Sequence, residues 1–121
     1  MSVLSAPLEK LCQSVPGALA ASIMGVDGLP VDTHTETKGD VDLSSLLVEY
    51  SSTLAQVRES AQMFAAGALE EISIRAENLT TIIRPITTEY FLALALLPEA
   101  NFGKGRYYLR MTAPELVDEL S

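Results

Sequence analysis

The feature that most constrains the fold is a change of hydrophobic period at Gly67. Before it, apolar residues recur with helical spacing through Leu43–Ala66. After it, Leu69–Ala76 has the alternation of a strand, and two further short apolar segments follow at Leu79–Ile86 and Tyr90–Leu97. Because the connections between these strands are so short, the sequence predicts one long amphipathic helix followed by a three-strand antiparallel meander.

The first third of the chain predicts a helix and a hairpin. Leu4–Val15 carries apolar residues at helical spacing, and Ala18–Met24 is uniformly apolar, which is typical of a strand buried on both faces. Asp27-Gly28 favours a tight turn into a return strand over Leu29–Thr35. Since Pro30 cannot donate to a ladder, we expect this return strand at the edge of the sheet.

The long helix has two different faces. Asp42 is the predicted N-cap and Gly67 the left-handed stop. One face should pack on the sheet: Leu43, Leu46, Leu47, Tyr50, Leu54, Val57, Ala61, Phe64 and Ala65. The other face is mostly small or neutral: Val48, Ser52, Ala55, Glu59, Gln62 and Ala66.

The C-terminal part predicts a last helix and a tail. Asn101 should cap a helix from Phe102 to about Met111, which places Gly103-Lys104-Gly105 in its first turn. The pair Thr112 and Glu115 around Pro114 has the spacing of a capping box, and it predicts a new helical start. We therefore expect one domain over residues 1–121, with its core at about 8–111 and a short tail at 112–121.

Composition excludes several classes of function. The formal net charge of −8 disfavours nucleic acid and anionic membrane surfaces as partners. The 48% of hydrophobic residues against 20% charged suggests a self-association surface. One cysteine, Cys12, permits no internal disulfide, and the first residues do not form a signal peptide; Tyr90–Leu97 is too short to span a bilayer. A cytoplasmic protein without membrane insertion is expected.

No catalytic, metal or cofactor site follows from the motifs. His34 has acidic neighbours, namely Asp32, Glu36, Asp40 and Asp42, but they lack the spacing of a Ca²⁺ loop, and a solvated acidic loop is the default interpretation. Cys12 is expected to be a buried structural thiol. Neither a phosphate-binding loop nor a nucleophile turn is present, and the paired carboxylates Glu70-Glu71 and Asp118-Glu119 are not placed to share a proton.

The order of these elements resembles the Roadblock (dynein light-chain) family over about Leu8 to Met111. The segments that carry the resemblance are Val15-Pro16-Gly17-Ala18, Val26-Asp27-Gly28-Leu29-Pro30-Val31, Ile83-Arg84-Pro85-Ile86, Phe91–Leu96 with Pro98–Gly103, and Arg106–Arg110. The resemblance implies an α/β (α+β) sandwich like that of profilin, with a five-stranded antiparallel sheet. The long helix would cover one face and the N- and C-terminal helices the other.

The resemblance also implies function. Family members form homodimers or pair with a paralogue, and they bind small Ras-like GTPases or act as scaffolds; the bacterial gliding-motility member activates its GTPase. By analogy the GTPase would dock on Val48, Glu49, Ser52, Gln56, Glu59 and Met63. The dimer interface would comprise Ala55, Gln62, Ala66, Ile72, Ser73, Ile74 and Arg75.

Alternatives remain at this stage. The chain could be a structural adaptor subunit that pairs with a Roadblock paralogue, or a small-molecule sensing module. An enzyme is disfavoured because no nucleophile lies beside a base in any motif.

Overall fold

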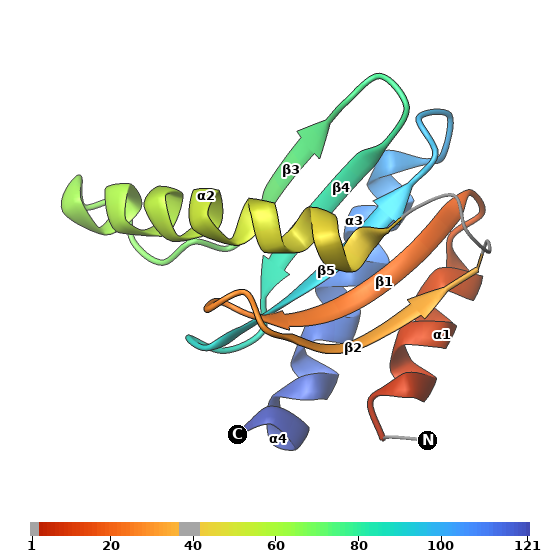
Figure 1. Ribbon diagram of the computed structural model, residues 1–121, viewed down its shortest axis with the longest axis horizontal. Coiled ribbons are helices and arrows are strands. Elements are labelled where there is room, and N and C mark those ends of the chain that lie inside the picture. Colours follow the sequence, from red (N-terminus) through yellow and green to blue (C-terminus); the bar gives the residue numbers. More distant parts are fainter. Residues whose placement is uncertain (1–2, 37–41) are drawn as a thin grey trace.

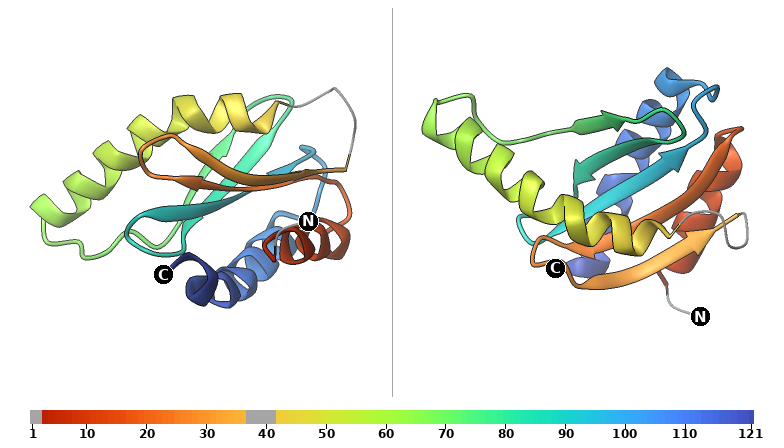
Figure 2. Two further views of the ribbon diagram at one scale, coloured as in Figure 1. Left: turned by 60° about the horizontal axis from the view of Figure 1, so that its bottom comes forward. Right: turned by 45° about the horizontal axis from the view of Figure 1, so that its top comes forward.

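The computed structural model describes residues 3–36 and 42–121, and it forms three layers (Figures 1 and 2). A sheet lies in the middle, the long helix crosses one face, and the N- and C-terminal helices cover the other (Figure 2). The predicted loop between Thr35 and Asp42, including Asp40, lies mostly outside the described residues. Within residues 3–36 and 42–121, no helix has both the length and the apolar character to cross a membrane.

The elements follow the predicted order. They are α1 (Ser5–Ser14), β1 (Ala18–Gly25), β2 (Pro30–Thr35), α2 (Leu43–Met63), β3 (Ile72–Arg75), β4 (Thr80–Pro85), β5 (Tyr90–Leu96), α3 (Phe102–Thr112), the 3₁₀ helix η1 (Ala113–Leu116) and α4 (Val117–Leu120). The strands form one antiparallel sheet in the order β2-β1-β5-β4-β3. The predicted fold class is therefore confirmed, and β2 with Pro30 is an edge strand as expected.

Alternation along the strands builds a core on each side of the sheet. Ile23, Ile82 and Leu94 face α1 and α3, where Leu8, Leu11 and Leu109 pack on them. On the other face of the same strands, Met24, Ile83 and Phe91 pack against Leu43, Leu47 and Leu54 of α2. Both faces of β1 and β5 are thus buried, which explains why their sequences are uniformly apolar.

The predicted N-cap residues of α2 and α3 are confirmed. The Asp42 carboxylate accepts a hydrogen bond of 3.1 Å from Ser45 N–H, and Asn101 Oδ1 accepts one of 2.9 Å from Lys104 N–H. The hydrogen bonds from Ser45 lower the pKa of Asp42. Gly28 turns the β1–β2 hairpin with a φ of 89°.

The predicted end of the long helix was wrong. α2 stops at Met63 instead of Ala66, and the backbone reverses through Ala65 and Gly67, with φ values of 57° and 91°. Phe64 and Ala65, expected on the core face, are exposed. The reason is that α2 leaves the sheet after Leu54, so its own chain offers these residues nothing to pack against.

Two other boundaries also differ from the prediction. β3 begins at Ile72 rather than Leu69, because the chain is still returning from the end of α2. Thr112 forms no capping box: its Oγ1 donates to the carbonyl of Tyr108, and helix α3 continues through it into η1. A threonine inside a helix has that backbone acceptor within reach, and Pro114 is tolerated in the first turn of η1.

Candidate interaction surface

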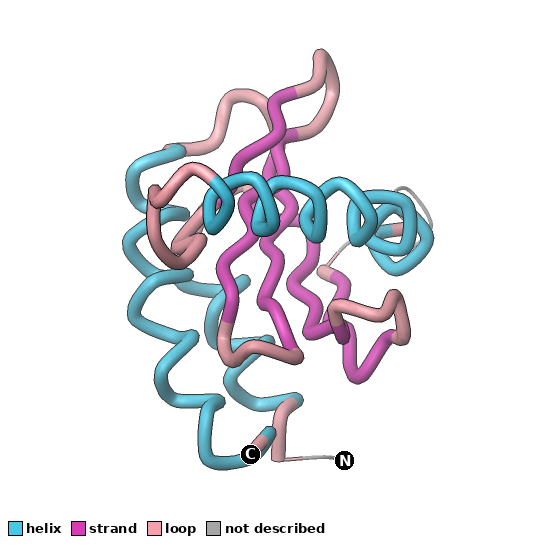
Figure 3. The backbone as a smooth tube through the Cα atoms, turned by 90° about the vertical axis from the view of Figure 1, so that its left-hand side faces the viewer, coloured by secondary structure: helices cyan, strands magenta, loops and turns pink. Residues whose placement is uncertain are grey.

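The second half of α2 projects beyond the sheet (Figures 1 and 3). The buried residues of α2 are Leu43, Leu47, Ser51 and Leu54, all in its first twelve positions. We call residues 55–64 the α2 arm. At its tip Met63 is 69% exposed and Phe64 78% exposed. Large apolar side chains gathered at the end of an unsupported helix are typical of a contact site.

The edge strand β3 offers unpaired backbone groups. It pairs with β4 on one side, and no other strand of residues 3–36 and 42–121 pairs with its outer side. Ala76 N–H donates to Leu79 O, so Ala76 and Leu79 are a hydrogen-bonded pair at the turn end of the β3–β4 ladder. Since hydrogen-bonded pairs alternate along an antiparallel ladder, the N–H and C=O groups of Ser73 and Arg75 point outward. A second strand can therefore be added there.

A mainly apolar groove lies between the α2 arm and the rest of the chain. Its volume is about 410 Å³, and its lining includes Leu69, Pro85 and Ile86. Arg58 Nη1 donates 2.9 Å to the carbonyl of Thr88, which ties the base of the arm to the β4–β5 turn. The groove, the arm and the segment that enters β3 thus form one continuous surface.

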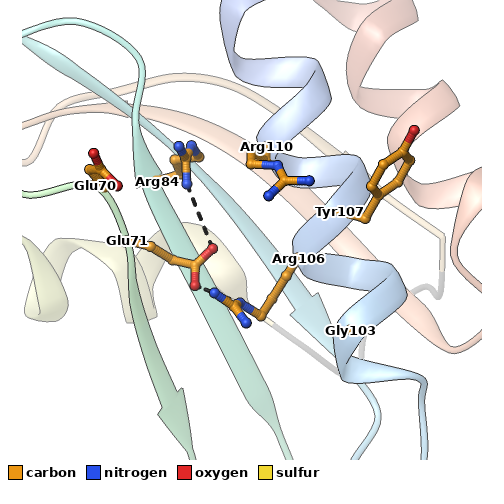
Figure 4. A pocket seen from close by; sticks show the side chains of 7 residues that line it. All are labelled: Glu70, Glu71, Arg84, Gly103, Arg106, Tyr107 and Arg110. Carbon is orange, nitrogen blue, oxygen red and sulfur yellow. Dashed lines mark hydrogen bonds and ion pairs between the residues drawn. The ribbon is translucent and has the colours of Figure 1, made fainter.

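On the opposite side of the sheet, three arginines gather around one carboxylate (Figure 4). Glu71 accepts a 2.6 Å hydrogen bond from Arg106 Nε and lies 3.8 Å from Arg84 Nη1. Arg110 lines the same pocket, of about 260 Å³, and its guanidinium lies 5.8 Å from the ring centre of Tyr107. Glu71 already interacts with the guanidinium groups of Arg84 and Arg106. The main effect of this cluster is therefore to hold the segment that precedes β3 against α3.

The structure leaves the predicted GTPase-docking residues accessible. Val48, Glu49, Ser52, Gln56, Glu59 and Met63 are all exposed on α2. The first three lie on the part that crosses the sheet, and the last three lie on the arm. Their role stays a prediction.

The residues predicted for a dimer interface fall on two elements. Ala55 and Gln62 are exposed on the arm, and Ala66 is exposed just beyond the end of α2. In β3, Ser73 and Arg75 are exposed, whereas Ile72 and Ile74 are half-buried on the α2 side of the sheet. Residues 65–71 connect the arm to β3 along the chain, and the role of both groups in dimerisation is still a prediction.

One cluster was missed by sequence reasoning. Cys12, His34 and Glu36 approach one another, although they are distant in sequence, and each offers a ligand atom within 4.8 Å of the other two. His34 lies in β2, within the predicted return strand, and its side chain is 27% exposed rather than fully solvated. Burial, and then the charge of Glu36, raises the pKa of the Cys12 thiol to about 12. Of the acidic neighbours expected around His34, Asp32 instead accepts from Ser5 Oγ, and Asp42 caps α2.

Comparison with known proteins agrees with this architecture. The chain matches the family model of the Roadblock/LC7 domain over residues 6–96. MglC from Myxococcus xanthus is 42% identical, with 96% of this chain and 98% of that chain covered and a TM-score of 0.70. A search of curated protein sequences finds no match.

Two more distant structures share the fold. A Roadblock/LC7 domain from Streptomyces avermitilis is 20% identical, with 98% of each chain covered and a TM-score of 0.85. The gliding protein MglB from Thermus thermophilus is 16% identical, with 97% of this chain and 89% of that chain covered and a TM-score of 0.85. The match over residues 6–96 and the 42% identity to MglC show that the chain belongs to the Roadblock/LC7 family.

Proposed function

We propose that this chain is a homodimeric, non-enzymatic regulator or scaffold for a small Ras-like GTPase. The observation that carries the proposal is that the chain has both an open β3 edge and an unsupported α2 arm. Membership of the Roadblock/LC7 family and the 42% identity to MglC support it.

In the proposed dimer, β3 pairs with β3 of a second copy about a two-fold axis. Ser73 and Arg75 supply the outward backbone groups, and each would meet the same strand in the partner. The two α2 helices then run side by side, where the small residues Ser52 and Ala55 permit close approach. Phe64 would become buried against the second copy, which accounts for its exposure in one chain.

The GTPase would dock on the outer face of the paired α2 helices. Glu49 and Glu59 are exposed there, and they give this face a negative charge that suits a basic patch on the GTPase. Such complementarity raises association rates more than it raises affinity. The proposed role is binding and positioning, and no side chain of this protein is assigned to chemistry.

Two measurements test the proposal separately. Light scattering over a dilution series should give twice the 13.0 kDa chain mass. Binding should then be measured against each small Ras-like GTPase of the same genome, loaded with GDP and with a GTP analogue. At least one GTPase should bind, and its hydrolysis or exchange rate should change. A strict monomer would refute the dimer, and failure with every GTPase in both states would refute the partner.

Charge reversal locates the docking face. Glu49→Lys combined with Glu59→Lys should slow GTPase association at least tenfold at low salt. Because Glu59 shares a helix face with Ser52 and Ala55, light scattering should first show that the double variant is still a dimer. The matched control is Glu99→Lys combined with Glu115→Lys, which reverses two exposed charges outside α2. Equal effects of the double variant and the control would exclude the α2 face as the docking site.

Two other functions have support from particular features. The same β3 edge could accept a Roadblock paralogue, which would make the chain an adaptor subunit; co-expression that yields only a heterodimer would favour that function. The groove beside the arm, about 410 Å³, is large enough for a small apolar ligand. A metabolite retained in native mass spectrometry would favour a sensing module.

A further inference from the structure

The edge strand β2 turns one polar face toward α1. The β1–β2 register pairs Ala21 with His34 and Ile23 with Asp32, and both of these β1 residues face the α1 side of the sheet. Since strand side chains alternate, Asp32, His34 and Glu36 all follow on that side. α1 lies over it: Ser5 Oγ donates 3.0 Å to the Asp32 carboxylate near the start of the helix.

Cys12 lies two helical turns after Ser5, so it meets the other end of β2. The thiol belongs to the core under α1 and is only 3% exposed. Cys12 Sγ, a ring nitrogen of His34 and a carboxylate oxygen of Glu36 all lie within 4.8 Å of one another. The backbone that carries Glu36 is held by its N–H, which donates 2.8 Å to Leu19 O. Helix α1 and the end of β2 with the residue that follows it thus bring three different donor atoms close together.

One nitrogen of the His34 ring lies in an unusual environment. Its Nε2 is buried and has no hydrogen-bond partner among the described residues. Glu36 Oε1 lies 3.4 Å away, which is close enough for an ion pair, but the two atoms do not form a hydrogen bond. A buried polar atom without such a partner is rare and is explained in many proteins by an ion or a water molecule.

We propose that Cys12, His34 and Glu36 form a binding site for a zinc-like divalent metal ion. Thiolate sulfur, imidazole nitrogen and carboxylate oxygen are the donors that Zn²⁺ prefers, and they bind it at about 2.0–2.3 Å. Tetrahedral geometry then requires donor atoms about 3.5 Å apart, so small side-chain rotations would close the present spacing. Water would complete the fourth position, because the side chains of His34 and Glu36 are 27% and 34% exposed.

The metal would link α1 to the free edge of the sheet. Among the described strands, β2 pairs only with β1. Near the start of α1, the hydrogen bond from Ser5 to Asp32 links the helix to β2. A bound ion at Cys12 would hold the other end. The site lies under α1 and far from β3 in the sheet order, so it is independent of the proposed dimer and docking faces.

The test uses Co²⁺ as a coloured substitute for Zn²⁺ on the full-length, tag-free chain after chelator treatment. The expected result is one Co²⁺ per chain, with a thiolate-to-cobalt charge-transfer band and the strong visible bands of tetrahedral cobalt, all displaced by Zn²⁺. Stoichiometric Zn²⁺ should also raise Tm, because a ligand that binds only the folded state stabilises it.

Variants decide which atoms bind. Cys12→Ala should abolish the charge-transfer band, and His34→Gln and Glu36→Gln should each weaken Zn²⁺ binding at least tenfold. Glu77→Gln, in the exposed β3–β4 turn, is the matched control and should bind like the natural chain. If Cys12→Ala fails to fold, Glu36→Gln, at the surface, still tests the site. Absence of the cobalt band in the natural chain, or binding unchanged in Glu36→Gln, would overturn the proposal.

Discussion

The Glu71 carboxylate accepts a 2.6 Å hydrogen bond from Nε of Arg106, so the segment that enters edge strand β3 is fixed to α3. The side chain of Glu71 is only 18% exposed, whereas that of Arg106 is 52% exposed. This contact joins the strand we assign to dimerisation with the helix layer on the far side of the sheet. The edge is therefore held in place before any partner arrives.

Removing this ion pair should cost little stability but should be measurable. In a double-mutant cycle of Glu71→Gln and Arg106→Gln, we expect a coupling free energy of about 0.5–1 kcal/mol, because Arg106 is half exposed and its charge is screened. Urea unfolding of the four proteins measures it. Glu70→Gln is the control, since Glu70 is exposed and forms no ion pair among the described residues. A coupling indistinguishable from zero would mean that the pair does not hold β3.

Two glycines in α3 should respond to alanine in opposite directions. At Gly105 a Cβ would lie 2.9 Å from Leu96 Cδ1, in the buried core, so Gly105→Ala should destabilise the chain by about 1–2 kcal/mol. At Gly103 the nearest atom would be Asn101 Oδ1 at 3.6 Å, an ordinary contact. Gly103→Ala should therefore stabilise by about 0.5 kcal/mol through helix propensity. Urea unfolding compares the two, and equal effects would contradict close packing of α3 on the sheet.

The exposed Phe64 gives a prediction about association. Phe64→Ser should leave the stability of the monomer within about 0.5 kcal/mol, because the side chain is 78% exposed. It should weaken the proposed dimer by roughly two to four orders of magnitude, since a two-fold dimer buries two copies of Phe64 and each contributes about 1.5–3 kcal/mol. Sedimentation equilibrium measures the association, and dilute samples give the unfolding free energy. The matched control is Leu29→Ser, which removes an apolar side chain, 66% exposed, from the β1–β2 turn.

The exposure of Phe64 also shows which part of the fold could not be predicted from the sequence. The caps at Asp42 and Asn101 and the turn at Gly28 were predictable, because each depends on residues within a few positions. The helical wheel placed Phe64 on the core face, since the wheel carries no information about where the axis of α2 leaves the sheet. That point is set by the width of the sheet under Leu54, which is a tertiary property.

The cluster at Cys12 was unpredictable for the same reason. Its residues come from α1 and from the region of β2, and nothing in their spacing indicates contact. Only the register of the hairpin and the position of α1 bring His34 under the thiol. Metal ligands contributed by different elements lack the short spacing that makes sequence motifs recognisable.

The outward backbone groups of β3 allow the most direct test of the dimer. Ser73→Pro removes an N–H that points away from β4, so the internal ladder through Ile72 and Ile74 should survive. Proline on that edge would block a second strand, and light scattering should then report a monomer at concentrations where the natural chain is dimeric. Ser73→Thr keeps the N–H and should remain dimeric. If Ser73→Pro still dimerises while folding normally, the two copies must meet through α2 alone, because strand pairing across β3 needs that N–H.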